Sequence, residues 1–315
     1  MNRSLRFDVI SVIMYKDLFF YKLIAAYAHK VAVKANPKKE MSRIYTKVFH
    51  KKPNIDSPKD LIEKIYWLQL HSDTSLWTKC ADKFRVREYI EECGLLDYMP
   101  KLYGKWDTVE EIPFDSLPAN YILKTNNGCC TCIVVRNGNV DREKVKKSLR
   151  QWMQIPYGYS GSQIHYTRIK PCIIAEELLE NDEKDRRISP NSIIDYKIFC
   201  FNGEPECIWV AYDRNSHHAN MALFDTQWNA HPEHLVNIQS KTYLPDIIIE
   251  KPKCLNEMLD IARKLAKPFK EVRVDLYVIK DRPIIGELTF TSGYGFFTED
   301  YYRYLGSKFE VGALE

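Results

Sequence analysis

One stretch near the C-terminus constrains the fold more than any other, because it contains two alternating segments joined by a polar connection. Apolar residues at positions 272, 274, 276 and 278 alternate with polar ones. After the polar residues 280–283, a second alternation runs from Ile284 to Phe290. Alternation of this kind predicts half-buried strands, and two such strands with a short connection predict a β-hairpin.

The pairing of these two strands brings two carboxylates together. If Val278 pairs with Ile284 across a loop of about five residues, Asp275 stands directly opposite Glu287. Like charges in opposed positions destabilise a sheet unless a cation lies between them, and Mg²⁺ prefers carboxylate oxygens. The alternative is a solvated hairpin face on which Arg273 neutralises one acid. The hairpin alone does not choose between these two interpretations.

The composition indicates an ordinary globular protein. The chain has 315 residues, of which 45% are hydrophobic and 28% charged, so it can form two domains or one large α/β unit. A net charge of +4 is too small to predict nucleic-acid binding. Nine cysteines, an odd number, indicate reduced thiols and a cytoplasmic protein. We expect no signal peptide, because Lys16 and Asp17 interrupt the apolar stretch that starts at Val9.

The first 50 residues mix aromatic and aliphatic residues with lysine and arginine, which predicts helix. Two interpretations remain open. The segment can lie as a basic amphipathic helix on an anionic membrane surface, or it can pack on the body of the protein with its lysines in water. The dispersed apolar residues favour packing.

Caps and alternation predict the other elements. Ser57 is expected to cap a helix that runs to about Leu70, and a second helix, which carries Lys83, is expected from about Ser75 to Gly94. Residues 181–192 are expected to form a loop. We expect strands at 121–124, 133–135, 171–175, 195–201 and 207–212, and helices at 141–153 and 255–266.

Lys124 ends a predicted strand immediately before the sequence TNNGCCTC. A loop that contains Asn127 and Gly128 can turn its backbone amides toward an anion, and a lysine beside it adds a mobile positive charge. Lysines at strand ends are common, so this signal is weak by itself.

Two further pairs of residues suit a nucleotide. Glu176 and Glu177 follow an apolar strand whose end can pair with the edge of an adenine ring, although an exposed acidic turn has the same pattern. Asp195 and Lys197 alternate on one face of their strand. They fit a ribose hydroxyl and a phosphate, and equally a surface salt bridge.

Six segments, taken in chain order, resemble the ATP-grasp superfamily. They are ADKFRVREYI, YILKTNNG, IIAEELL, DYKIFCFNG, VRVDLY and GELTFTSGYG. More narrowly, they resemble the TupA-like ATP-grasp family found in capsule and surface-polysaccharide gene clusters, over roughly residues 56–306. The resemblance implies an α+β fold in which two α+β subdomains sandwich ATP, preceded by a helical N-terminal region. We expect this region at 1–74, the first subdomain at 75–180 and the second at 181–315.

The resemblance also implies three groups of site residues. The nucleotide-binding group is Lys83, Lys124, Asn127, Gly128, Glu176, Glu177, Leu179 and Asp195. The catalytic pair beside the transferred phosphoryl group is Lys197 and Arg273. The magnesium ligands are Asp275, Glu287 and Thr289.

Two positions depart from the family pattern. Thr289 stands where most ATP-grasp enzymes have asparagine, so the third metal ligand is a neutral hydroxyl or a water. Cys129 and Cys130 stand in the phosphate loop where small flexible residues are expected.

The activity implied by the resemblance is an ATP- and Mg²⁺-dependent carboxylate–amine ligase that acts through an acyl phosphate. Its substrates would be an amine and a carboxylate-bearing sugar or amino acid, and its product would decorate a surface polysaccharide or its precursor. Two alternatives stay open: a kinase that phosphorylates a sugar hydroxyl, and a non-catalytic ATP-binding scaffold. We expect a cytoplasmic protein without nucleic-acid partners, with residues 1–50 as the candidate contact to the inner face of the membrane.

Overall fold

The structure, a computed structural model, describes the backbone of residues 3–215 and 217–312, with side chains from Phe19 onward. The α-helices in this range are α1 (Arg3–Ala35), α2 (Pro37–Phe49), α3 (Leu61–His71), α4 (Ser75–Ala81), α5 (Val86–Glu92), α6 (Arg142–Gln154), α7 (Glu183–Ile188), α8 (Leu255–Ala266) and α9 (Glu299–Gly306). The strands are β1 (Leu102–Trp106), β2 (Tyr121–Thr125), β3 (Cys132–Val135), β4 (Ile173–Glu177), β5 (Asp195–Phe201), β6 (Glu204–Tyr212), β7 (Ala219–Asp225), β8 (Lys241–Tyr243), β9 (Glu271–Ile279) and β10 (Arg282–Thr289). Short 3₁₀ helices are η1 (Leu96–Tyr98), η2 (Val109–Glu111), η3 (Ile164–Arg168) and η4 (Pro232–His234).

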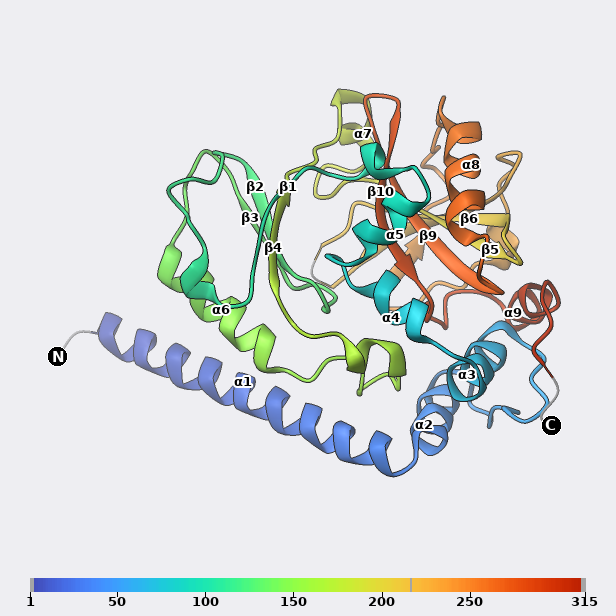
Figure 1. Cartoon of the computed structure of the whole chain (residues 1–315), viewed down its shortest axis with the longest axis horizontal. Helices are drawn as coiled ribbons and strands as arrows, with labels where there is room; N and C mark the ends of the chain where they lie inside the picture. The colour runs from blue at the N-terminus through green and yellow to red at the C-terminus, as the bar shows by residue number, and fades with distance from the viewer. Residues whose placement is uncertain (1–2, 216, 313–315) are drawn as a thin grey trace.

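The strands form two sheets (Figure 1). The smaller sheet has the order β1-β4-β2-β3, and the larger has the order β10-β9-β5-β6-β7-β8. Each sheet has its own hydrophobic core. Helix α6 contacts β2 of the smaller sheet, and α8 contacts β5, β6 and β9 of the larger one. The predicted α+β class is therefore confirmed.

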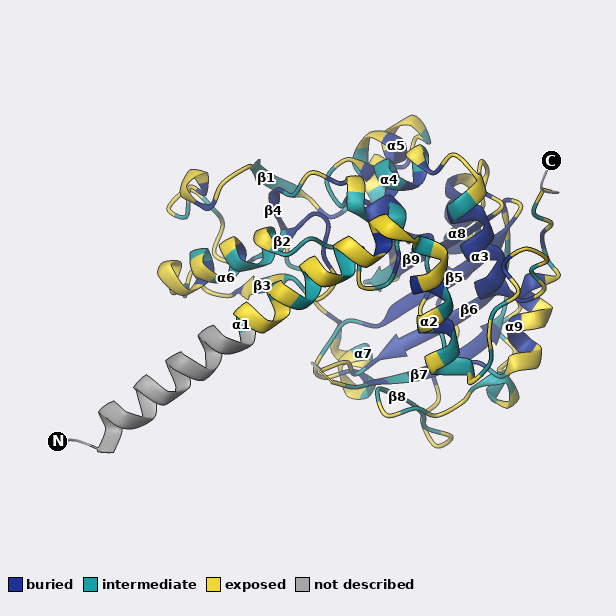
Figure 2. Cartoon of the chain, turned by 90° about the horizontal axis from the view of Figure 1, so that it is seen from below, coloured by how far each residue is buried: buried dark blue, intermediate teal, exposed yellow. Residues whose placement is uncertain are grey.

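Helix α8 has the bounds that its apolar spacing predicts. Leu255, Met258, Leu259, Ala262 and Leu265 are all buried against the larger sheet. They recur at three- and four-residue intervals, so one face of the helix covers the apolar face of the sheet. In Figure 2 α8 and strands of the larger sheet are largely dark blue, the colour of buried residues.

The hairpin of β9 and β10 is confirmed, but the predicted turn is wrong. The turn is a tight one formed by Lys280 and Asp281, with φ of 52° and 60°. Val278 consequently pairs with Pro283 rather than with Ile284. Two consecutive residues with positive φ give a turn whose twist matches that of the paired strands.

A β-bulge at Gly286 then corrects the register by one residue. The pairing shifts between Ile285 and Glu287, so that Glu287 pairs with Asp275. A bulge inserts one extra residue into one strand of an antiparallel pair. The predicted opposition of the two carboxylates is therefore confirmed, although a different turn produces it.

The first helix after the N-terminal region begins later than predicted. Asp60, not Ser57, is the N-cap of α3, and its carboxylate accepts a hydrogen bond of 2.9 Å from the Glu63 amide. The Glu63 side chain accepts from the Asp60 amide in return, which completes a capping box.

The predicted helix from about Ser75 to Gly94 is two helices, α4 and α5. The buried Asp82 carboxylate accepts from the amides of Phe84 and Arg85 at 2.9 and 3.2 Å, so the side chain bonds the backbone where the helix would otherwise continue. Lys83 therefore lies in the break and not on a helix. Its amide donates to the Asn126 carbonyl at 3.0 Å, which ties the break to the loop after β2.

Among the described α-helices and strands, five were not predicted: β1, β7, β8, α7 and α9. The segment expected to be a loop at 181–192 also contains the short helix α7. Asp182 caps this helix by accepting a hydrogen bond of 2.9 Å from the Asp185 amide. Its six residues are too few for the charge pattern to reveal a helical face.

Helix α1 confirms the helical prediction for the N-terminal region, although the chain breaks at Asn36 before α2. The apolar residues expected before Phe19 lie outside the described side chains. Figure 2 shows little burial along the described part of α1. Its exposed apolar side chains are Phe20, Tyr21, Ile24, Tyr27 and Val31. Among the described residues, no helix combines the length and apolar character needed to cross a membrane.

Candidate active site

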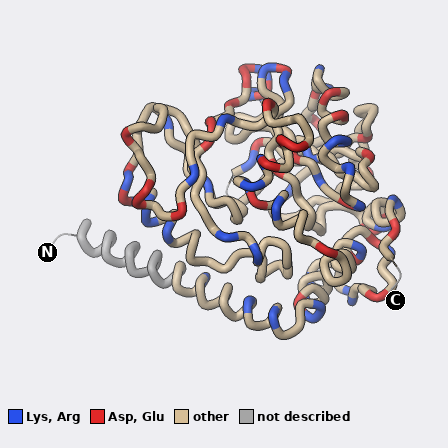
Figure 3. The backbone as a smooth tube through the Cα atoms, in the orientation of Figure 1, with Lys and Arg blue, Asp and Glu red and all other residues tan. Residues whose placement is uncertain are grey.

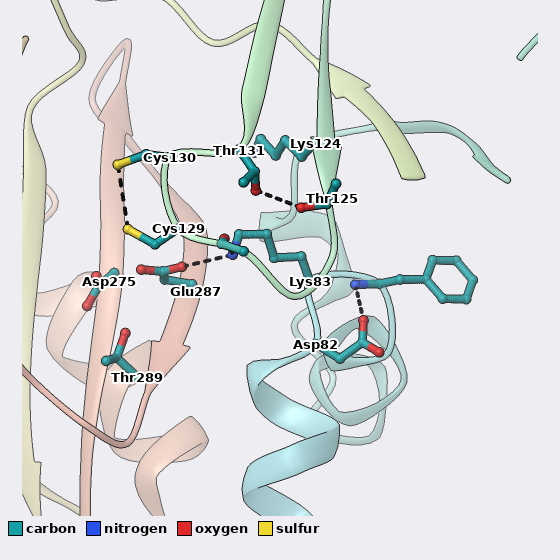
Figure 4. Close-up of polar contacts among 12 residues, drawn as sticks. Asp82, Lys83, Lys124, Thr125, Cys129, Cys130, Thr131, Asp275, Glu287 and Thr289 are labelled. Atoms are coloured by element: carbon teal, nitrogen blue, oxygen red, sulfur yellow. Dashed lines mark hydrogen bonds and ion pairs between the residues drawn. The ribbon is translucent and has the colours of Figure 1, made fainter. Parts of the chain in front are cut away.

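The residues predicted to bind phosphate and metal meet where the loop between β2 and β3 reaches the β9–β10 hairpin. Figure 4 shows Cys129 and Cys130 of this loop beside Glu287 and Asp275, with Lys83 between the loop and the hairpin. The site therefore lies between the two sheets, and segments far apart in the chain form it.

Asp275 is at the centre of this site and is buried. Arg273 donates to it twice, from Nε to Oδ1 at 2.6 Å and from a terminal nitrogen to Oδ2 at 2.7 Å. Lys197, its partner on β5, donates to Oδ2 as well. Burial raises the pKa of Asp275, but the charges of Arg273 and Lys197 outweigh burial and hold the pKa below its ordinary value.

Asp195 and Lys197 lie on the same face of β5, as predicted, and they form an ion pair of 2.6 Å. Arg214 also donates to the Asp195 carboxylate, at 2.7 Å. Asp195 and Asp275 thus hold Lys197 between them, and both carboxylates are buried. Among the described residues, Asp195 Oδ1 has no hydrogen-bond partner.

Glu287 and Thr289 complete the predicted metal group. Glu287 is 36% exposed and lies 3.6 Å from Lys83 Nζ, so its carboxylate faces open space. The Thr289 hydroxyl accepts a hydrogen bond of 3.1 Å from Arg273. Asp275, Glu287 and Thr289 are therefore brought together, with Arg273 touching two of them.

The loop after β2 is tied to its surroundings at several points. Lys83 Nζ donates to the Gly128 carbonyl at 2.8 Å, and the hydroxyls of Thr125 and Thr131 lie 2.6 Å apart across the loop. A Cβ on Gly128 would lie 2.3 Å from the Thr131 hydroxyl, so only glycine fits there. Asn127 is buried beside it. The loop is glycine-poor, but its glycine stands where a side chain would clash with Thr125 and Thr131.

Lys124 and Glu176, predicted to bind phosphate and adenine, are bonded to each other. Lys124 Nζ donates to Glu176 at 2.8 Å, and Arg87 donates to the other carboxylate oxygen at 2.7 Å. Burial raises the pKa of Glu176, but Lys124 and Arg87 together lower it by more than burial raises it. The net shift of the pKa is therefore downward. Glu176 therefore stays ionised and positions Lys124.

The other two predicted adenine residues lie further out. Glu177 is the exposed last residue of β4, and its amide donates to the Lys101 carbonyl at 2.9 Å. Leu179 lines a hollow of about 350 Å³ together with Arg136 and Ile193. Among the described residues, the lining of this hollow includes no other predicted site residue.

Cys129 and Cys130 are exposed, with their sulfurs 3.6 Å apart. A hydrogen bond from Cys129 lowers the pKa of Cys130 to about 6, and it raises the pKa of Cys129 well above the ordinary range. Cys130 also has a positive φ of 58°, which is uncommon for a residue other than glycine. Of the two thiols, Cys130 is therefore the one that ionises more readily.

Sequence reasoning gave no site role to Arg87 and Lys241. Lys241 lies on the unpredicted strand β8, with Nζ 6.0 Å from the Trp209 ring centre and 5.2 Å from that of Phe296. Its pKa is lowered by burial and then by the positive charges of Arg214, Arg273 and Lys197. Four cations thus converge here, and only the fold brings Lys241 into the group.

Comparison with solved structures finds distant similarity to ligases. A solved structure of D-alanine–D-alanine ligase from Bacillus anthracis is 15% identical, with a TM-score of 0.40, and the match covers 68% of this chain and 58% of that one. A solved structure of L-amino acid ligase from Bacillus licheniformis is 12% identical, with a TM-score of 0.42, over 70% of this chain and 43% of that one. This chain therefore spans about half the length of these structures. No curated protein matches the sequence.

The two sheets, with the site between them, lie within the part of the chain that the family comparison covers. Residues 63–310 match the family described as TupA-like ATP-grasp. The chain belongs to this family.

Proposed function

We propose that the protein is an ATP- and Mg²⁺-dependent carboxylate–amine ligase. The observation that carries the proposal is the pairing of Asp275 with Glu287 at a point where Lys83, Lys197 and Arg273 converge. In this proposal ATP lies between the two sheets, with its phosphates toward this cluster.

The residues present fit a magnesium ion. The carboxylate of Asp275 has about four acceptor positions and three are used, which leaves one on Oδ1. Glu287 is partly exposed and contacts only one cation among the described residues, and Thr289 offers a neutral oxygen. Asp275, Glu287 and Thr289 would hold the ion, which when bound neutralises phosphate charge.

The surplus of positive charge supports an anionic ligand. Burial, and then the charges of Arg214, Arg273 and Lys197, lower the pKa of Lys241. These four cations face two buried carboxylates, Asp195 and Asp275, which leaves a local excess of positive charge. Bound phosphate would relieve it. Lys197 and Arg273 would stabilise the charge on the transferred phosphoryl group, while Lys83 and Lys124 would hold the other phosphates.

In the proposed reaction the γ-phosphoryl group passes to a substrate carboxylate, and an amine attacks the resulting acyl phosphate to give an amide and phosphate. The loop with Asn127 and Gly128 would cover the phosphates and exclude water that hydrolyses the intermediate. Membership of the TupA-like family supports a uronic acid or an amino acid as the carboxylate. The product would then belong to a surface polysaccharide or its precursor.

The test is release of ADP with Mg²⁺ and a panel of uronic acids, amino acids and amines, with identification of the product. An amide plus phosphate supports the ligase, a phospho-sugar supports the kinase, and ATP binding without consumption supports the scaffold. Asp275→Asn and Glu287→Gln should lose nearly all turnover. Asp260→Asn, an exposed acid on α8, is the matched control.

We also propose that the protein is cytoplasmic and contacts the inner membrane face through α1. Phe20, Ile24, Tyr27 and Val31 recur at four- and three-residue intervals and are 49–69% exposed. Basic residues gather at the end of α1 and along α2 (Figure 3). Sedimentation with vesicles of anionic lipid should fall when Ile24 is replaced by glutamate, whereas equal sedimentation of parent and variant would contradict this contact.

A further inference from the structure

A cluster of potential metal ligands lies at η4, outside the candidate active site. His231, Glu233 and His234 each offer one ligand atom, and these atoms lie within 4.8 Å of one another. The side chains of both histidines are about one-third exposed and that of Glu233 is 58% exposed, so solvent ions can reach them. Two imidazoles and a carboxylate form a set that suits Zn²⁺ and not Mg²⁺.

The separations within the cluster fit one ion. His231 Nδ1 lies 2.9 Å from Glu233 Oε1, and His234 Nε2 lies 3.7 Å from the same oxygen. Ligands at about 2.1 Å from a tetrahedral ion are about 3.4 Å apart. The two observed distances lie on either side of this value, and the two histidine ligand atoms lie within 4.8 Å of each other, so the three side chains must rotate to hold one ion.

A fourth residue is placed as the outer partner of a metal-bound histidine. Asp225 Oδ2 lies 3.6 Å from His231 Nε2, the ring nitrogen that Glu233 does not face. The Asp225 carboxylate is fixed by the amides of Gln227 and Asn229 and by the Asn229 side chain, at 2.7–2.9 Å. Metal-bound histidines commonly donate their other N–H to such a carboxylate, which holds the ring in orientation.

The backbone around the cluster is held on both sides. The His231 amide donates to the Leu223 carbonyl of β7, and the Thr298 amide donates to the His234 carbonyl, both at 2.9 Å. The His234 ring also stacks on Tyr301, with ring centres 4.2 Å apart. The ligands therefore sit on a rigid support, which is what a preorganised metal site requires.

The cluster opens on a hollow of about 320 Å³. Its lining includes His231, His234, Asp225, Tyr301 and Tyr304. A site with three protein ligands leaves one coordination position for water or a small ligand. Here that position would face the hollow.

This cluster is separate from the candidate active site. Arg273, Phe199, Cys207 and Asp225 are successive partners across β9, β5, β6 and β7, so three strand spacings, or about 14 Å, separate the first from the last. The rings of Phe199 and Phe297, 5.8 Å apart between centres, are part of the packing between the two sites.

We propose that His231, Glu233 and His234 bind a divalent transition-metal ion such as Zn²⁺, with Asp225 orienting His231. The test uses the full-length protein, treated with a chelator and dialysed, and titrated with Zn²⁺ in competition with a chromogenic chelator. We expect one high-affinity equivalent, and Co²⁺ in its place should give the visible absorption of a tetrahedral site.

The variants His231→Ala, His234→Ala and Glu233→Gln should each weaken Zn²⁺ binding at least about tenfold, and Asp225→Asn about tenfold. His71→Ala, an exposed histidine on α3, is the matched control and should bind as the parent does. Thermal unfolding without metal checks that the variants fold. Parent protein without a high-affinity site, or cluster variants that bind as tightly as the parent, would overturn the proposal. Neither result bears on the nucleotide site, because the titration contains no ATP.

Discussion

Asp275 and Glu287 are direct partners across the β9–β10 hairpin, and the bulge at Gly286 sets their pairing. Without the bulge, the tight turn at Lys280 and Asp281 would pair Asp275 with Gly286 instead of with Glu287. A one-residue slip moves every side chain of a strand to the other face. The bulge is therefore what places both carboxylates on the face with Lys83 and Arg273.

The first prediction follows from this bulge. A Cβ on Gly286 would lie 2.9 Å from the Tyr277 ring and 3.1 Å from the Asp275 carbonyl oxygen, so Gly286→Ala must displace β10 from β9. We expect the dissociation constant for ATP in the presence of Mg²⁺ to rise about tenfold, because the carboxylates separate. Calorimetry with and without Mg²⁺ measures this. The control is Gly312→Ala, because the atom nearest to an added Cβ there lies at 3.4 Å. If Mg²⁺ changes the dissociation constant for ATP equally in the parent, Gly286→Ala and Gly312→Ala, the bulge does not position the carboxylates for the ion.

The ion triad of Lys124, Glu176 and Arg87 gives a second prediction. Glu176→Gln leaves two cations without their shared carboxylate in a buried place, so the free energy of unfolding should fall by about 3 kcal/mol. Glu177→Gln, on the exposed neighbouring residue, should change it by less than about 0.5 kcal/mol. Denaturant unfolding compares the two, and equal effects would mean that the triad contributes little.

Cys130 gives a third prediction, on thiol reactivity. Because the hydrogen bond from Cys129 lowers the pKa of Cys130 to about 6, its alkylation by iodoacetamide should increase through pH 6 and level off by pH 7. Cys129→Ala removes this bond and should move the midpoint upward, toward the ordinary cysteine pKa. Mass spectrometry of peptides alkylated at a series of pH values measures both midpoints. Identical midpoints in parent and variant would exclude the hydrogen bond as the cause.

His165 gives a prediction on acid stability. It is buried among Trp77, Tyr166 and Phe290, and burial followed by the charge of Arg168 lowers its pKa to about 3. Below about pH 6.5 the unfolded chain binds a proton at His165 that the native protein does not, so stability falls as the pH drops toward 3. His165→Phe removes this proton from the unfolded state.

The stability of His165→Phe relative to the parent should therefore rise by about 2 kcal/mol between pH 7.5 and pH 5.0. Denaturant unfolding at the two pH values measures the difference. A constant offset between the two proteins would mean that His165 titrates alike in both states.

The sequence predicts those elements whose apolar spacing follows from one buried face. Helix α8 is an example, because one of its faces packs on the larger core. Lys83 shows where such reasoning stops. Its segment consists mainly of residues that tolerate helix, and the break depends on the Asp82 carboxylate bonding the backbone.

In the candidate site, too, some residues can be predicted from a local sequence pattern and others cannot. Asp275 and Glu287 could be paired from the hairpin pattern, since their separation along the chain is short. Arg87 and Lys241 could not, because their neighbours come from distant segments: Arg87 contacts Glu176, and Lys241 lies over Trp209 and Phe296. Strand β8, with three residues, is too short to show a periodicity.

The central claim, transfer of phosphate to a carboxylate, is tested most directly by isotope tracing. The protein would be incubated with MgATP, hydroxylamine as the amine, and a panel of uronic and amino acids labelled with ¹⁸O in the carboxylate. We expect ADP, a hydroxamate and phosphate in equal amounts for at least one acid, with one ¹⁸O atom from the carboxylate in the phosphate. Phosphate free of ¹⁸O, or a phospho-sugar in place of the hydroxamate, would contradict it.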